Sequence, residues 1–165
     1  PLGSEGLVLL PFFNGERIPD YPNGEAVLGG MNMTNVKKEN IARSALEGVS
    51  FEFLLGLEAF KELSFVPKRA SLTGGGSKSE FWRQMISDIT GLEIRCPQVE
   101  EAAAFGSALE ALAVAEGRSV VDTAEEHLVF DEEKKAYPNM ENHEKYKACY
   151  EKWKKYSSSM APIFS

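Results

Sequence analysis

The segment from Arg69 to Gly91 constrains the fold of this chain more than any other. The short stretch Arg69–Thr73 (RASLT) runs into the glycine run Gly74–Gly76, and an amphipathic pattern then continues to Gly91. This order predicts a strand, a glycine turn and a helix, because an apolar run stops at glycines and a helical apolar spacing follows. Gly91 predicts the end of that helix, since glycine is the usual residue after the last turn.

The start of this helix predicts a place where an anion can bind. Glycines let a backbone approach a ligand because they carry no Cβ, and a helix start offers unpaired N–H groups and a positive dipole end. Ser77 with Glu80 three residues later predicts a capping box, and the hydroxyls of Ser77 and Ser79 add possible donors. The spacing is neither that of a P-loop nor that of a dinucleotide-binding loop. From these residues alone, a phosphate site and a flexible turn that binds nothing are both open.

Strands and helices are predicted to alternate along most of the chain. Three strands are expected, over Leu7–Phe13, Arg69–Thr73 and Leu92–Cys96. Four helices are expected, over Lys37–Leu63, from Ser77 to Gly91, over Glu100–Glu116 and over Glu141–Ser159. Such alternation predicts an α/β layer structure with a short, mainly parallel sheet flanked by helices.

Several packing relationships are also predicted. Gly48 and Gly56 lie inside the first long helix, where each costs about 1 kcal/mol relative to alanine, so close packing against neighbours is expected at both. The small residues of the helix over Glu100–Glu116 predict a close crossing with another backbone. The last helix carries an aromatic row that predicts a face docked on the core: Tyr146, Tyr150, Trp153 and Tyr156.

The loop over Asn14–Met33 is rich in glycine, proline and asparagine, and loops of this length are often functional. Its first part carries Asn14, Glu16, Arg17 and Asp20 close together. These side chains predict either a charged cluster that faces a ligand in a cleft or a loop held by its own salt bridges. Both interpretations are open from the sequence.

Composition and charge exclude some functions. The net charge of −7 argues against a nucleic-acid partner. The sequence has no run of about 20 apolar residues, so no membrane span is predicted. The lone cysteines Cys96 and Cys149 predict reduced thiols in a cytoplasmic protein, and the sequence lacks metal-ligand spacing and any Ser-His-Asp set. The start Pro1–Ser4 is interpreted as the remnant of a purification tag, which leaves 5–165 as one domain.

Three segments in this order resemble the FGGY carbohydrate kinases. AVLGGMNMTNVKKENIARSALE, over Ala26–Glu47, is similar to a family signature. LTGGGSKSEFWRQMISDITG, over Leu72–Gly91, is similar to the adenosine-binding segment, and EEAAAFGSALEA, over Glu100–Ala111, is similar to the helix that follows it. The resemblance covers roughly Gly6 to Gly117.

The resemblance implies an RNase H-like (actin-like ATPase) fold and a share in Mg-ATP binding. Members of the family have two such domains, with the sugar bound mainly by the N-terminal one and ATP, with Mg²⁺, mainly by the C-terminal one. The implied ATP-binding residues in this chain are Gly74, Gly75, Gly76, Ser77 and Ser79. The catalytic aspartate belongs to the N-terminal domain, so no catalytic residue and no metal ligand is expected here. This chain alone is therefore expected to be an inactive piece that needs its own N-terminal domain.

Within the family, the phrase LPFFNGERIP, over Leu10–Pro19, is most similar to xylulokinases, although gluconate kinases share its Gly-Glu-Arg part. The expected acceptor is D-xylulose, and the alternatives are another sugar or polyol such as gluconate or ribulose, or a non-catalytic assembly domain of the same fold. Sheet edges left unpaired by absent strands predict a homodimer.

Overall fold

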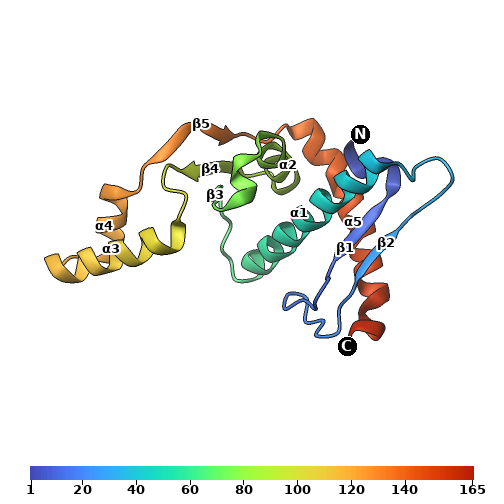
Figure 1. The fold of residues 1–165 in the computed structure, drawn as a ribbon, viewed down its shortest axis with the longest axis horizontal. Coiled ribbons are helices and arrows are strands. Elements are labelled where there is room, and N and C mark those ends of the chain that lie inside the picture. The colour runs from blue at the N-terminus through green and yellow to red at the C-terminus, as the bar shows by residue number, and fades with distance from the viewer.

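A computed structural model describes all 165 residues as an α/β chain with two small sheets (Figure 1). The first sheet pairs two antiparallel strands, β1 (Val8–Pro11) and β2 (Ala26–Gly29). In the second sheet β3 (Arg69–Ser71) pairs in parallel with β4 (Glu93–Pro97), and β4 pairs antiparallel with β5 (Phe130–Ala136). The helices are α1 (Lys38–Glu62), α2 (Glu80–Thr90), α3 (Ala102–Glu116), α4 (Val120–His127) and α5 (Met140–Phe164), with short 3-10 turns over Leu2–Gly6 and Gly75–Lys78.

The main core lies where α1 and α5 pack against the hairpin of β1 and β2. The inward side chains of β1, Val8 and Leu10, are buried there, as the alternation of a strand requires. Trp153 of α5 is 1% exposed, and its indole nitrogen donates a hydrogen bond of 3.0 Å to the carbonyl oxygen of Leu9. The predicted docking face of α5 is confirmed, because Tyr146, Tyr150 and Trp153 are all buried.

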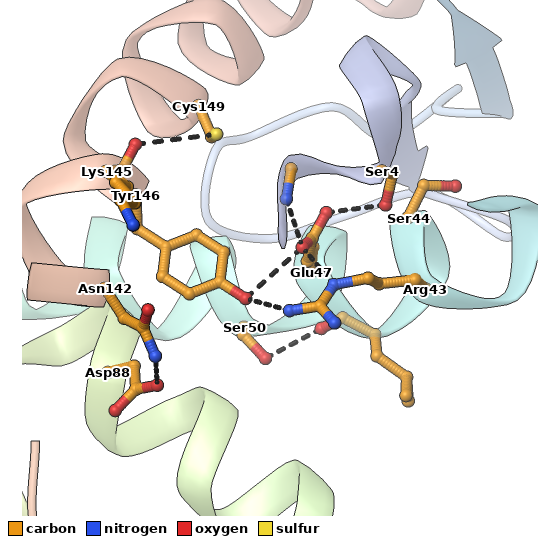
Figure 2. Close-up of polar contacts among 12 residues, drawn as sticks. Ser4, Arg43, Ser44, Glu47, Ser50, Asp88, Asn142, Lys145, Tyr146 and Cys149 are labelled. Carbon is orange, nitrogen blue, oxygen red and sulfur yellow. Dashed lines mark hydrogen bonds and ion pairs between the residues drawn. The ribbon is translucent and has the colours of Figure 1, made fainter. Parts of the chain in front are cut away.

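Glu47 of α1 joins three segments inside this core (Figure 2). Its carboxylate accepts hydrogen bonds from the amide of Gly3 at 2.9 Å, from the hydroxyl of Ser4 at 2.7 Å and from the guanidinium of Arg43 at 2.8 Å. The hydroxyl of Tyr146, on α5, lies 3.3 Å from the same carboxylate. Glu47 therefore fastens the start of the chain and α5 to α1, and Ser4 is fully buried in this contact.

The sheets differ from the predicted ones. The expectation of a mainly parallel sheet is not confirmed, since β3 with β4 is the one parallel pair of three. The segment Ala26–Gly29 was expected to be loop, but it forms β2 because its backbone pairs with β1. The elements α4 and β5 were not predicted. The sequence of β5, FDEEKKA, is mostly charged, and backbone pairing with β4 rather than an apolar pattern makes it a strand.

The close packing expected at helix glycines holds at one of the two. A Cβ on Gly48 would lie 2.4 Å from the carbonyl oxygen of Leu9, whereas a Cβ on Gly56 would meet nothing within 4 Å. The expected close crossing of α3 is not found: α3 packs on α4, and Ala103 and Ala104 are exposed. These two helices project at the left of Figure 1. None of the helices combines the length and the apolar character that crossing a bilayer requires.

Candidate functional site

The glycine loop, defined here as residues 74–79, joins β3 to α2. Gly74 has a φ of 79° with a ψ of −169°, a backbone conformation that a residue with a Cβ rarely adopts. Residues Gly75–Lys78 then form one 3-10 turn, which Ser77 closes by donating from its hydroxyl to the carbonyl oxygen of Gly74 at 2.7 Å. The loop therefore has a defined shape in which both backbone and side-chain hydrogen bonds fix the turn.

The N-cap of α2 is Ser79, and the prediction of Ser77 with Glu80 as a capping box is wrong. The hydroxyl oxygen of Ser79 accepts a hydrogen bond from the amide of Trp82 at 3.3 Å. The 3-10 turn takes up the residues before it, so the α-helix begins two residues later than the sequence pattern predicts. The C-terminal end was predicted correctly, since Gly91 ends α2 with a φ of 72°.

One side of the loop is open. A Cβ added to Gly74 or to Gly75 would meet no atom within 4 Å, and both residues are exposed. Gly76 differs, because its Cβ would lie 2.6 Å from the indole ring of Trp82. A ligand can thus approach the backbone at Gly74 and Gly75, while Gly76 is a glycine because Trp82 packs beneath it.

Two side chains of α2 support the loop from inside. Trp82 packs on Gly76, and its indole nitrogen donates to the hydroxyl of Ser50 on α1 at 3.0 Å. Arg83 is 6% exposed and donates from Nη1 to the carbonyl oxygen of Ser77 at 2.7 Å. Sequence reasoning missed both supports. Their position in the first turn after Ser79 is the signal that could have indicated them.

The segment after β4 reaches the same end of the sheet as the glycine loop. Because β3 and β4 are parallel, the segments that follow them start at one edge, which is where ligands bind in open α/β sheets. Lys78 and Glu100 join the two segments by an ion pair of 2.7 Å. The carboxylate of Glu100 raises the pKa of Lys78, and Lys78 lowers the pKa of Glu100. The start of α3 therefore borders the glycine loop.

The loop over residues 14–20 forms a separate hollow. Asn14, Glu16, Arg17 and Asp20 line a cavity of about 360 Å³, together with Gly15 and Pro22. The carboxylate of Glu16 accepts from the amides of Arg17 at 2.7 Å and of Ile18 at 3.3 Å, and none of these charged side chains forms an ion pair. Hydrogen bonds rather than salt bridges thus hold this loop.

The structure does not bring the two candidate segments together. No residue of the glycine loop lines the hollow at residues 14–20. In Figure 1 this second loop lies at the lower end of β1, whereas the glycine loop lies beside α2. The described residues contain no group of three or more His, Cys, Asp or Glu side chains that could hold a metal ion. The glycine loop is therefore the better candidate for an anionic ligand.

Comparison with known proteins identifies the family. Residues 2–115 match the family described as "FGGY family of carbohydrate kinases, C-terminal domain". The chain belongs to this family. The match includes the glycine loop and the helix α3 that borders it, so the resemblance found in the sequence is confirmed.

The relatives of this FGGY chain include enzymes with different names. The xylulose kinase of Haemophilus influenzae is 40% identical over 154 residues, which are 93% of this chain and 31% of that protein. The gluconokinase of Bacillus subtilis is 38% identical over 109 residues, 65% of this chain and 21% of that protein. The chain thus spans about a third or less of the curated relatives that it matches.

The structural comparison confirms the fold. The crystal structure of ligand-bound xylulose kinase from Lactobacillus acidophilus superposes with a TM-score of 0.85 at 23% identity, over 99% of this chain and 33% of that protein. At this identity the likeness bears on the fold alone. The α/β chain of two small sheets is accordingly the fold of one third of an FGGY kinase.

Proposed function

We propose that this chain is the ATP-binding part of a kinase that transfers the γ-phosphoryl group of ATP to D-xylulose, giving D-xylulose 5-phosphate and ADP. The observation that carries the proposal is the open backbone at Gly74 and Gly75, at the start of the 3-10 turn that precedes α2 and at the carboxyl end of a parallel strand pair. Backbone amides and a helix N-terminus without a Cβ in the way fit a phosphate. Gly76, Ser77 and Ser79 complete the proposed ATP-binding residues.

The chain supplies binding rather than chemistry in this proposal. The glycine loop offers amide and hydroxyl donors, and the nearby carboxylate of Glu100 is paired with Lys78. Mg²⁺ would therefore arrive bound to the ATP phosphates rather than to this loop. The group that takes the proton from the sugar hydroxyl is expected in the N-terminal domain, so the chain alone is expected to be inactive. Phosphoryl transfer depends on positioning from both sides of a cleft.

Support for D-xylulose comes from the extent of similarity. The Haemophilus influenzae xylulose kinase matches 93% of the chain, and the gluconokinase matches 65%. We therefore place D-xylulose before gluconate. The hollow lined by Asn14, Glu16 and Arg17 is proposed to face the cleft between the two domains, because four of its six lining residues are polar or charged and its Arg17 forms no ion pair.

The binding proposal is tested by calorimetry of this chain with ATP and ADP. Gly75→Val places a side chain in space that is empty in the free protein, so the fold should be retained and nucleotide affinity lost. Gly56→Val is the matched control, because a Cβ there also meets nothing within 4 Å and Gly56 belongs to α1, outside the glycine loop. Equal affinities of the two variants for ATP would contradict the proposal.

The substrate proposal is tested on the longer kinase that contains this chain. ADP release is measured with Mg-ATP and D-xylulose, L-xylulose, ribulose, gluconate, glycerol and erythritol. A preference for D-xylulose is the expected result. A preference for another acceptor would be compatible with the proposed ATP site but would contradict D-xylulose as the substrate. No turnover by folded protein would favour a non-catalytic assembly domain.

We also propose a homodimer and a cytoplasmic location. Strand β3 lies at the edge of its sheet, and such an edge presents unpaired backbone groups to a second copy. A monomeric mass in light scattering at high protein concentration would contradict the dimer. Both cysteines, Cys96 and Cys149, are free, which accords with a reducing compartment.

A further inference from the structure

Arg83 is a buried cation without an anionic partner. It is the fourth residue of α2, it is 6% exposed, and none of the ion pairs of the chain includes it. Its Nη1 donates to the carbonyl oxygen of Ser77, and its Nε is buried and has no hydrogen-bond partner. Burying a charge without a partner costs free energy, so proteins retain such a group where it has a function or where a bound ligand supplies the opposite charge.

The Arg83 guanidinium lies next to the glycine loop. The Ser77 carbonyl that Arg83 holds belongs to the 3-10 turn of the glycine loop, two residues after the open backbone of Gly75. Burial raises the pKa of the Cys96 thiol on β4, and the positive charge of Arg83 opposes that rise. Arg83 is thus a buried charge in direct contact with the loop at which the proposed ATP site opens.

We propose that Arg83 is a positioning residue that makes the glycine loop selective for the phosphates of the nucleotide. The inference rests on the proposed ATP binding. Its guanidinium holds the loop through the Ser77 carbonyl and adds a positive charge under the start of α2, where it acts together with the helix dipole. In a poorly solvated position such a charge attracts a polyphosphate more strongly than it would in water. The polyphosphate is the anion that this chain does not itself provide for Arg83.

The test separates the charge from the shape of the loop. Affinities for ATP and for adenosine are measured by calorimetry on this chain and on three variants, and circular dichroism verifies their fold. Arg83→Met removes the charge and keeps the length of the side chain, and Arg83→Lys keeps the charge without the planar fork. Arg118→Met is the matched control, because it removes the same charge from an exposed site between α3 and α4.

We expect Arg83→Met to lose about tenfold or more in ATP affinity while adenosine affinity stays within about twofold. Arg83→Lys should keep most of the preference for ATP over adenosine, and Arg118→Met should bind as the unmodified chain does. A parallel loss of ATP and adenosine affinity in Arg83→Met would overturn the proposal, because it would leave Arg83 a purely structural role. If Arg83→Met does not fold, a lost preference for ATP in Arg83→Lys would overturn it.

The same experiment separates this inference from the proposed function. Failure of the unmodified chain to bind ATP would overturn both. Binding of ATP that is insensitive to Arg83→Met would overturn the role of Arg83 alone and leave the ATP site in place.

Discussion

The indole nitrogen of Trp82 donates a hydrogen bond of 3.0 Å to the hydroxyl oxygen of Ser50, which joins α2 to α1 directly after the glycine loop. Ser50 is fully buried, and its own hydroxyl donates to the carbonyl oxygen of Leu46 at 2.7 Å. The indole ring also packs on Gly76. Trp82, which supports the proposed nucleotide loop, is therefore held by a residue 32 positions earlier in the chain, on the 25-residue helix α1 of the core.

Replacement of Ser50 should weaken the fold through this bond. Ser50→Ala leaves the indole N–H of Trp82 without its partner, and we expect a loss of about 1–2 kcal/mol in the free energy of unfolding. Urea unfolding measures it. Ser158→Ala is the control, because the Ser158 hydroxyl also donates to the carbonyl four residues earlier but is exposed. Equal losses in the two variants would show that the indole bond contributes nothing.

The two glycines inside α1 should respond to alanine with opposite signs. Gly48→Ala forces a Cβ to within 2.4 Å of the Leu9 carbonyl, and we expect a loss of about 1–3 kcal/mol in the free energy of unfolding. The Cβ added by Gly56→Ala meets no atom within 4 Å. This variant should raise the free energy of unfolding by up to about 1 kcal/mol, since alanine is more favourable than glycine in a helix interior. Thermal unfolding of both variants checks the pair, and a loss of stability in Gly56→Ala would be inconsistent with the structure.

Glu47 lies in the segment Ala26–Glu47 that resembles a family signature, and we expect it to be essential for the stability of the fold. Glu47→Gln removes the charge that pairs with Arg43 and replaces one acceptor oxygen by a donor, so we expect a loss of about 2 kcal/mol or more in the free energy of unfolding. Glu116→Gln is the control, because Glu116 pairs with Arg118 on the surface and should change stability by less than about 0.5 kcal/mol. If Glu47→Gln unfolds at the same denaturant concentration as the control, the buried network is not stabilising.

Glu52 should make stability depend on pH. Burial, with the carboxylate of Glu16 nearby, raises the pKa of Glu52 from 4.5 to about 7. The folded state therefore binds a proton that the unfolded state releases, so the contribution is present below pH 4.5 and is lost as pH rises through about 7. Glu52→Gln should gain on the order of 1 kcal/mol over the unmodified chain near pH 8, since the half-buried position screens part of the effect.

Urea unfolding at about pH 5 and about pH 8 checks this sign. The advantage of Glu52→Gln should be larger at the higher pH and should shrink as Glu52 takes up its proton. A difference between variant and unmodified chain that is the same at both pH values would contradict the protonation of Glu52 in the folded state.

Local sequence predicted the elements whose signals are local. The helix over Lys37–Leu63 is confirmed as α1 because its apolar spacing is long and unbroken. The C-terminal ends of α2 and α3 are at Gly91 and Gly117, which are both left-handed, as glycine at those positions predicts. The aromatic row of α5 was likewise found from spacing alone. Family membership also followed from the sequence, since the glycine run and its flanking segments are contiguous motifs.

Only the tertiary structure decided the features that depend on distant residues. Strands β2 and β5 exist because β1 and β4 pair with their backbones. The apolar segment of β2 is only four residues long and lies in a glycine-rich stretch, and β5 is mostly charged. In the candidate site, the sequence indicated the glycines but not what holds them. The contacts of Trp82 with Ser50 and of Lys78 with Glu100 cross 22 or more positions of the chain, and the open space at Gly75 is a property of the packed structure. A sequence pattern reports the conformational preference of neighbouring residues, whereas pairing and packing energies depend on which distant segments meet.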